Sequence, residues 1–499
     1  MRTIGVALAQ SHSPPDSLTR IHRMMTCFAT FLLGIAPILA CSDLDLALQE
    51  FSVASIESDV EFLACEELEG RGTPSLGLAT SALYIKARLE RLGYQPGARS
   101  GYFHEYPLIS QRINVDKSFV NLGSASGAKR LEFGSDYFFR TAELAALDLQ
   151  GEVISIGDGS SRSLAECDVE GRWALLLDTG KTTSRAVRAV HAAGGIGVVF
   201  VAGEDYTRKS YQERFAPTVR AMIEGGVMQP DRAKALSSSI LPRLWLSETA
   251  LQELLDLSNP FDGGLPPAGT VLGVDLHELR VPDGAEVHVR NVCGFLPGTN
   301  PELARETLVI SAHYDHLGRV SGVIHPGADD NASGTAGLLA LAAALKAHGA
   351  YERSIMLLWV SGEEKGLWGS EAWAKDAWLP EGAQAVANIN LDMIGRTAVK
   401  ELYVTPSRAH PKFNGIAELV YELASLEGFD SPKSQDQYWR SSDHFNFSSV
   451  LGLPVAYLSS GDHDDYHESG DTADKVDCEK ITRVARLVLR MIDRLQTGE

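Results

Sequence analysis

Short apolar strands alternate with longer helical segments from Val287 to the end of the chain. Residues 308–312 form an apolar run of strand length, and residues 334–348 form an Ala- and Leu-rich helical pattern. The alternation continues with predicted strands at 355–360, 387–391 and 454–458 and predicted helices at 368–378 and 478–495. This order predicts an α/β fold in which helices flank a mostly parallel mixed sheet.

The region before this alternation has a different pattern of apolar and turn-forming residues. Residues 140–260 contain short β-rich runs separated by glycines and polar turns, and a Pro- and Gly-rich linker at 259–269 follows them. Residues 50–139 contain a helical pattern that ends at Gly93. At 499 residues the chain is too long for one compact core. We therefore expect a main α/β domain at 285–499, its N-terminal part at 50–139, and a β-rich insert at 140–260.

Residues 1–41 resemble an export signal. Basic residues precede an apolar run at 27–39, and Ala40 follows that run. A basic flank, a short apolar segment and a small residue before the cleavage site are typical of secretory signals, and the run is too short for a comfortable membrane span. The cysteine at Cys41 is similar to that of bacterial lipoprotein signals, which implies lipidation and membrane attachment; plain secretion is the alternative. We expect an exported protein of the cell envelope, in the periplasm, on a membrane or secreted.

Charge and cysteine content exclude two classes of function. The net charge is −20 and no basic stripe is present, whereas a nucleic-acid partner requires clustered Lys and Arg. Beyond Cys41 the chain has four cysteines, without CxxC spacing, so we expect neither a cysteine zinc site nor an obligatory disulfide.

Side chains capable of metal chemistry occur in five segments, after the predicted strands or in loops. These are His313 with Asp315, Asp330, Glu363 with Glu364, Asp392, and His467. Taken singly, each has a simpler structural interpretation as a hydrogen-bonded turn, a helix cap or a solvated loop. Because ligands of parallel sheets collect at the carboxyl ends of the strands, we expect these segments to converge.

Together these residues match the needs of a two-metal centre. A shared aspartate, two further carboxylates and two histidines provide each of two zinc ions with three protein ligands. Three carboxylates and one hydroxide also balance the charge of two divalent ions. The HExxH pattern of common single-zinc proteases is absent from the sequence. The predicted cofactor is therefore two Zn²⁺ ions per chain.

The segments around these residues are similar to the motif set of metallopeptidase family 28, which includes leucyl aminopeptidases and glutamate carboxypeptidase II. They read SAHYDHLG, GADDNASGTAGLLALA, SGEEKGLWGS, NINLDMIGR and DYHESGDTADKVD, and the likeness covers residues 285–499. Residues 140–260 resemble the protease-associated domain that many members carry. The resemblance implies a zinc-exopeptidase fold. It also implies one zinc bound by His313, Asp330 and Asp392, and another bound by Asp330, Glu364 and His467.

The resemblance implies further roles near the metals. Glu363 would be the general base, which takes a proton from a zinc-bridging water and later delivers it to the leaving amine. Asp315 would orient the ring of His313. The peptide bond between Asp330 and Asn331 would be strained or cis.

Residues that face the substrate are harder to assign. Family members often carry an aromatic hydroxyl that assists the carbonyl oxygen, shortly before a Ser-Asp-His motif. By this resemblance Tyr438 would play that part before Ser442-Asp443-His444, although alignment by spacing places Trp439 there. A pocket lined by Tyr457, Tyr466 or Trp368 would favour apolar N-terminal residues.

The leading interpretation is an aminopeptidase that removes N-terminal residues from peptide substrates. A carboxypeptidase of the same fold is an alternative; it would need a basic pocket, for which Arg396 and Arg440 are candidates. A glutaminyl cyclase would be expected to use one zinc, and a binding protein that has lost catalysis should lack ligands or Glu363. The oligomeric state is left open.

Overall fold

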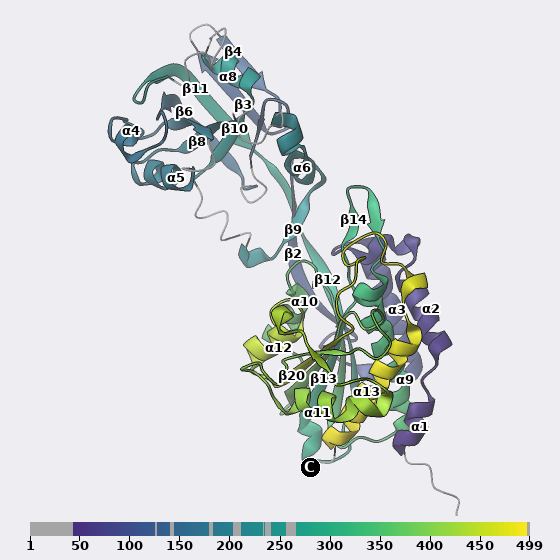
Figure 1. Cartoon of the computed structure of the whole chain (residues 1–499). Helices are drawn as coiled ribbons and strands as arrows, with labels where there is room; N and C mark the ends of the chain where they lie inside the picture. The colour runs from purple at the N-terminus through teal and green to yellow at the C-terminus, as the bar shows by residue number, and fades with distance from the viewer. Residues whose placement is uncertain are drawn as a thin grey trace, which may run out of the picture. The chain divides into compact units, whose positions relative to one another are not determined.

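The computed structural model describes residues 43–124, 127–139, 144–178, 183–202, 211–232, 234, 241–255 and 266–496. The predicted export signal at 1–41 lies outside these residues. Two large sheets contain most of the described strands (Figure 1). In this part of the chain no helix is both long enough and apolar enough to cross a membrane.

The first sheet has ten strands with a parallel centre. Nine of them follow the order β19, β18, β20, β17, β13, β16, β12, β2, β9, and β1 pairs with β12. Their bounds are β1 Gln95–Pro96, β2 Phe103–Ile113, β9 Gly226–Met228, β12 Pro282–Leu296, β13 Glu306–His313, β16 Ser354–Val360, β17 Gln384–Leu391, β18 Tyr403–Thr405, β19 Lys433–Ser434 and β20 Val455–Ser459. Strands β16, β13, β17 and β20 run parallel, whereas β12 and β2 are antiparallel to their neighbours. The predicted α/β fold class is confirmed.

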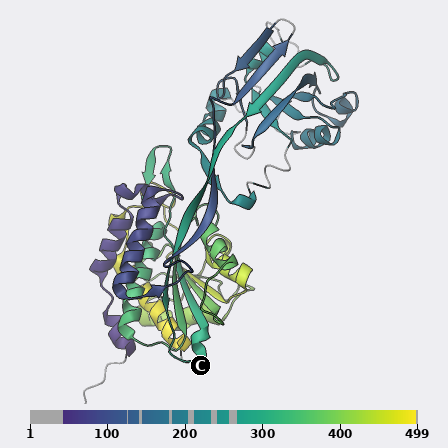
Figure 2. The same cartoon turned by 180° about the vertical axis from the view of Figure 1, so that it is seen from behind.

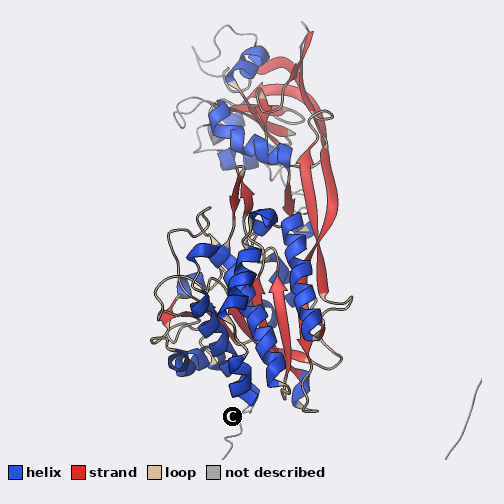
Figure 3. Cartoon of the chain, turned by 90° about the vertical axis from the view of Figure 1, so that its right-hand side faces the viewer, coloured by secondary structure: helices blue, strands red, loops and turns tan. Residues whose placement is uncertain are grey.

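Helices cover both faces of this sheet (Figures 1 and 3). One face shares a core with α1 Asp43–Gln49, α2 Val53–Leu63, α3 Leu76–Leu92, α9 Gly334–His348, α11 Gly415–Leu423 and α13 Cys478–Gln496. The other face packs against α10 Trp368–Lys375 and α12 His444–Leu451. Both faces are covered because successive side chains of a strand point to opposite faces of the sheet. In strand β16, Ile355, Leu357 and Trp359 enter the first core, and the residues between them enter the second.

Local sequence signals define the helix ends. The side chain of Ser75 accepts a hydrogen bond from the Leu78 amide at the start of α3, and Gly93 ends this helix in the left-handed conformation at φ 73°. This is the predicted stop at Gly93. A short hairpin of β14 Gly318–Val320 and β15 Val323–His325 lies between β13 and α9.

The second sheet has eight strands in the order β4, β3, β11, β6, β7, β8, β10, β5. Figure 2 shows this region from behind, in the blue and teal part of the chain. Their bounds are β3 Phe119–Ser124, β4 Gly127–Leu131, β5 Tyr137–Phe138, β6 Leu147–Ser155, β7 Trp173–Asp178, β8 Gly197–Ala202, β10 Arg243–Leu246 and β11 Val271–Arg280. Helices α4 Ser161–Ala165, α5 Thr183–Ala192, α6 Tyr211–Glu224 and α8 Glu248–Leu255 belong to the same region. Two apolar cores include side chains of this sheet.

This β-rich region is inserted between two neighbouring strands of the first sheet. The chain leaves after β2 and returns through β12, and these strands pair from Phe103 with Val292 to Ile113 with Pro282. The sheet extends beyond the predicted limits of 140–260, because β3, β4 and β11 also belong to it. Strand β4 is mostly exposed and β11 alternates between buried and exposed positions, so neither forms the continuous apolar run that marks a buried strand.

Candidate metal centre

The candidate site lies where the parallel strands of the first sheet end. His313 is the last residue of β13 and pairs in register with Val360, the last residue of β16. Glu363 and Glu364 follow β16, and Asp392 directly follows β17. Because these strands are parallel neighbours, their carboxyl ends meet at one edge and bring the predicted residues together.

Asp330 reaches this edge from the loop before α9. The backbone amides of Asp329 and Asp330 both donate to the buried carboxylate of Asp471 at 3.0 Å. The Asn331 side chain donates to the Leu391 carbonyl at 2.9 Å, which ties the loop to the end of β17. The peptide bond between Asp330 and Asn331 is cis, in agreement with the prediction.

The first group of metal-compatible atoms comes from His313, Asp330 and Asp392. The Nε2 atom of His313 lies 3.3 Å from Oδ1 of Asp330 and 3.1 Å from Oδ1 of Asp392. All three side chains are buried. The Ser442 hydroxyl donates to the other oxygen of Asp392 at 2.6 Å and so fixes its orientation.

The second group of metal-compatible atoms comes from His316, Asp330 and Glu364, and His467 lies beside two of them. The Nε2 atom of His467 is 3.2 Å from Oδ2 of Asp330 and 3.2 Å from Oε2 of Glu364. Asp330 thus presents one oxygen to His313 and the other to His467. A carboxylate that bridges two metal ions needs this arrangement, with one oxygen directed at each ion.

The charge of the site also fits two divalent cations. Buried carboxylates normally require a paired cation or a metal ion. The side chains of Asp330, Glu364 and Asp392 are at most 8% exposed, and histidine is the only basic residue type in their ion pairs among the described residues. The carboxylates of Asp330 and Glu364 raise the pKa of His467 to about 10. The imidazole and carboxylate donors match the preferences of zinc.

The ring of His313 is held by Asp315, but mainly through the backbone. The Nδ1 atom of His313 is 3.1 Å from the Asp315 carbonyl oxygen, whereas the nearer carboxylate oxygen of Asp315 is 3.8 Å away. That carboxylate accepts hydrogen bonds from Thr73 at 2.8 Å and from the amide of Glu363 at 3.2 Å. The orienting contact expected from the Asp315 carboxylate is therefore made by the Asp315 carbonyl in this structure.

Glu363 faces the small cavity beside the metal-compatible groups. Burial raises the pKa of its carboxyl group well above the ordinary value, and the neighbouring Glu364 carboxylate raises it further, although His313 opposes the shift. A carboxyl group with a raised pKa is suited to proton transfer near neutral pH.

The cavity has a volume of about 30 Å³ and is lined by aromatic and acidic side chains. Tyr438, Tyr457 and Tyr466 line it, whereas Trp368 is not among its lining residues. The Tyr438 hydroxyl donates to Asp462, another lining residue, at 2.5 Å.

Neither arginine considered for a basic pocket lines this cavity. Arg396 forms ion pairs with Asp465 at 2.7 Å and with Asp471 at 3.6 Å. Arg440 lies over the ring of Phe445. The described lining residues include no Lys or Arg.

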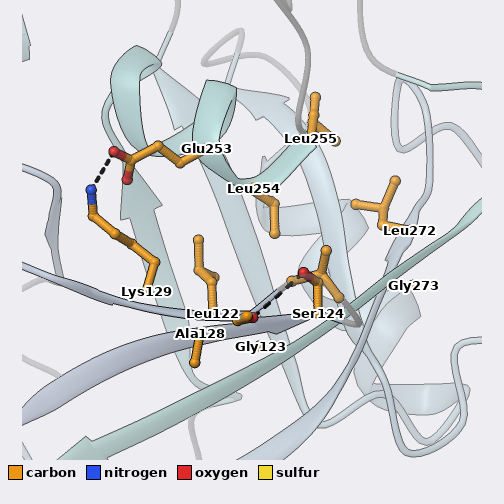
Figure 4. Close-up of a pocket in the computed structure, with 12 residues that line it drawn as sticks. Leu122, Gly123, Ser124, Ala128, Lys129, Glu253, Leu254, Leu255, Leu272 and Gly273 are labelled. Carbon is orange, nitrogen blue, oxygen red and sulfur yellow. Dashed lines mark hydrogen bonds and ion pairs between the residues drawn. The ribbon is translucent and has the colours of Figure 1, made fainter.

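A larger cavity, of about 490 Å³, lies in the inserted region (Figure 4). It is lined by leucines and backbone of β3, β4 and β11, and its Lys129 and Glu253 side chains form an ion pair at 2.5 Å. Both groups of metal-compatible side chains found among the described residues lie outside this cavity. The volume of a cavity therefore does not identify the candidate metal site.

Several residues of the site were not singled out from the sequence. Asp471 holds the Asp330 loop, and Arg71 donates hydrogen bonds to the carbonyls of Tyr314 and Gly327 at 2.9 and 2.8 Å. His316 is fully buried beside Asp330 and Glu364. The sequence indicated that His316 could belong to the site only through its position in the segment SAHYDHLG, three residues after His313.

A parallel α/β sheet whose strand ends bear paired histidine and carboxylate groups defines a candidate two-metal hydrolase. The comparison with protein families agrees, since the sequence profile of Peptidase family M28 matches residues 291–492. This region of the chain is thus similar to that metallopeptidase family. The inserted β-rich region is consistent with a protease-associated domain.

Named relatives are aminopeptidases. A probable leucine aminopeptidase of Arthroderma otae is 28% identical over 211 residues, which cover 40% of this chain and 56% of the relative. Aminopeptidase YwaD of Bacillus subtilis is 30% identical over 191 residues, covering 37% of this chain and 40% of the relative. The match thus spans about half the length of these proteins. An aminopeptidase structure from Aneurinibacillus sp. strain AM-1 has a TM-score of 0.52 at 19% identity, covers 90% of this chain and 95% of its own, and shows the shared fold.

Proposed function

We propose that this chain is a zinc-dependent aminopeptidase that removes N-terminal residues from peptides with two zinc ions per chain. His313, Asp330 and Asp392 would hold one ion, and Asp330, Glu364 and His467 the other. The observation that carries the proposal is the position of Asp330, whose two oxygens lie 3.3 Å from His313 and 3.2 Å from His467. The aminopeptidase relatives support the same conclusion.

Glu363 supplies proton transfer in this proposal. It lines the cavity next to Asp330 and Asp392, and its raised pKa allows it to hold a proton after accepting one. It takes a proton from the attacking water and delivers it to the departing amine. Zinc, when bound, polarises the scissile carbonyl and makes the attacking water more acidic.

The Tyr438 hydroxyl is the proposed hydrogen-bond donor to the carbonyl oxygen of the substrate. It donates to Asp462, another residue of the cavity lining, and would exchange this acceptor for the substrate oxygen. A donor directed at the oxygen on which negative charge develops stabilises the transition state more than the ground state.

The sign of charge around the cavity favours cleavage at the amino end. A substrate N-terminus is an ammonium group, and the cavity presents carboxylates, including Asp462, which is outside both metal groups. A carboxypeptidase would instead need a basic side chain for the substrate carboxylate, and the described lining includes no Lys or Arg. Arg396 is already engaged by two aspartates.

Export is part of the proposal. The sequence at 1–41 supports a cleaved signal with lipidation of Cys41 and attachment of the protein to a membrane of the cell envelope. Peptides are the proposed partners, and the inserted domain, predicted at 140–260, would guide them toward the site.

The decisive test is to follow the shortening of a peptide by mass spectrometry. An unmodified peptide and its N-acetylated copy are incubated with the zinc-loaded protein, with and without chelator. The proposal predicts stepwise loss of N-terminal residues from the free peptide, none from the acetylated copy, and loss of activity with chelator that zinc restores. Shortening from the carboxyl end would show a carboxypeptidase, and undiminished activity in chelator would refute zinc dependence.

A further inference from the structure

We propose that Arg396 is a positioning residue that holds the proposed metal ligand His467 in place. The segment concerned is the His467 loop, residues 462–471, which lies between β20 and α13. The inference deepens the proposed function and rests on its two-zinc centre. It gives a role to an arginine that follows the ligand Asp392 by four residues and does not line the cavity.

The guanidinium group of Arg396 contacts the His467 loop on both sides of His467. One terminal nitrogen donates to Oδ2 of Asp465 at 2.7 Å, and the other lies 3.6 Å from Oδ1 of Asp471. Asp465 precedes His467 by two residues, and Asp471 follows it by four. A planar guanidinium presents its donors in a fixed fork, whereas an ammonium is a compact point charge. Arg396 therefore spans the stretch of chain that contains His467.

The backbone of Arg396 is itself fixed. Its amide donates to the Ser460 hydroxyl at 3.0 Å, and its carbonyl accepts from the ammonium group of Lys480 at 2.5 Å. Ser460 and Lys480 are both fully buried. Arg396 therefore attaches the His467 loop to the segment after β17, which carries Asp392.

His467 needs this support because of its backbone conformation and its exposure. Its φ is 58°, in the left-handed region that residues other than glycine rarely adopt. The Glu468 amide donates to the Asp465 carbonyl at 2.9 Å, so the turn that contains His467 begins at Asp465. The His467 side chain is 38% exposed, whereas those of the other proposed ligands are at most 8% exposed. Packing therefore restrains this ligand least, and the ion pairs of Arg396 supply the missing restraint.

The second partner of Arg396 connects the His467 loop to Asp330. The Asp471 carboxylate is fully buried and accepts from the amides of Asp329 and Asp330 at 3.0 Å. In the ion pairs of the described residues, Arg396 is the only basic partner of Asp471, and a buried carboxylate normally requires such a partner. One arginine thus connects His467 with the loop of Asp330, and these two residues are ligands of the same zinc ion in the proposed centre.

Lys475 provides a matched comparison. Its ammonium group also contacts the Asp465 carboxylate, at 2.8 Å, but the side chain is 40% exposed. It donates as well to the Gly470 carbonyl at 2.7 Å, within the His467 loop. Exposed ion pairs contribute little because water and salt screen them. Lys475 therefore contacts the same aspartate as Arg396 without the second contact to Asp471.

The test measures zinc binding by the full chain in competition with a chelator, with elemental analysis of the zinc that remains. Arg396→Gln should weaken binding of one zinc ion about 10- to 100-fold, the range typical for a residue that orients a ligand, and leave the other unchanged. Arg396→Lys keeps a cation but not the fork that spans both aspartates, so its effect should be smaller. Lys475→Gln should bind both ions within about 5-fold of the wild type.

Crystals of zinc-treated Arg396→Gln identify the ion that is affected. An anomalous difference map at the zinc edge should retain the peak beside His313 and Asp392 and lose occupancy at the peak beside Glu364 and His467. If Arg396→Gln does not fold, the same measurements on Arg396→Lys decide the proposal.

Three results would overturn the proposal: zinc affinities in the Arg396 variants equal to those of the wild type, equal weakening of both ions, or equal effects of Lys475→Gln and Arg396→Gln. Any of these, with two zinc ions and peptide hydrolysis in the wild type, would leave the proposed function standing. Failure of the wild type to bind zinc at all would overturn both.

Discussion

The Nε2 atom of His467 lies 3.2 Å from Oδ2 of Asp330, although all the elements from α9 to β20 separate the two residues in the chain. The other oxygen of Asp330 faces His313 at 3.3 Å. Asp330 therefore contacts both of the histidines that we propose as ligands of different metal ions. Its position depends on the fold around it as well as on its own loop.

Glu363→Gln should remove the proton acceptor while preserving the size of the side chain. Because general acid–base catalysis typically contributes about 100- to 10,000-fold, we expect kcat to fall by that factor. Zinc content, measured by elemental analysis, should stay at the wild-type level, since Glu363 is not among the proposed ligands. Turnover within a few-fold of wild type would remove Glu363 from the mechanism.

Tyr438→Phe should lower kcat with little effect on KM, because a hydrogen bond to a developing oxyanion acts mainly in the transition state. The expected loss is about 100-fold, at the lower end for removal of one such donor. Steady-state kinetics on a free dipeptide measures it. Tyr421→Phe, at a tyrosine of α11 that does not line the cavity, is the matched control. Equal turnover in both variants would exclude the Tyr438 hydroxyl.

Asp471→Ala should destabilise the loop that carries Asp330. The Asp471 carboxylate accepts from the amides of Asp329 and Asp330, and a buried donor left without a partner costs about 1–3 kcal/mol. We expect the free energy of unfolding to fall by at least that amount in denaturant titrations of the metal-free protein, with weaker zinc binding. Asp474→Ala, at an exposed aspartate nearby, should change neither. A variant of Asp471 as stable as wild type would contradict this account.

Zinc binding should become tighter as the pH rises toward about 10. The carboxylates of Asp330 and Glu364 raise the pKa of His467 to that value, so the metal-free protein holds a proton there that an exposed histidine loses near its ordinary pKa of about 6.5. Zinc must displace this proton. Calorimetric titration with a competing chelator, in buffers of different ionisation enthalpy, should show proton release and a rising affinity in this window. A zinc affinity that does not change with pH there would exclude His467 as a ligand.

The α/β fold and the convergence of the metal-compatible side chains could be predicted from the sequence for a simple reason. Periodicity reports which residues are buried, and in a parallel sheet every residue directly after a strand lies near the same edge. His313 and Asp392 could be placed in this way, because they follow the strong apolar runs of β13 and β17. The resemblance to the peptidase family added the cis bond after Asp330, which local propensity does not reveal.

Contacts between distant segments could not be predicted in the same way. Asp471 looks like one more acid in a polar loop, and only the fold shows that its carboxylate caps the backbone of Asp329 and Asp330. Likewise, the segment SAHYDHLG places His316 three residues after His313 but does not reveal that its ring is buried. His313 contacts the Asp315 carbonyl rather than the Asp315 carboxylate, and the two distances differ by less than 1 Å, a difference that a sequence does not reveal.

The central claim, two zinc ions joined by Asp330, is tested most directly by crystals of the zinc-loaded protein measured at the zinc absorption edge. Anomalous difference maps should show two peaks on opposite sides of the Asp330 carboxylate, one beside His313 and Asp392 and the other beside Glu364 and His467. A single peak, or peaks that do not contact Asp330, would contradict the account.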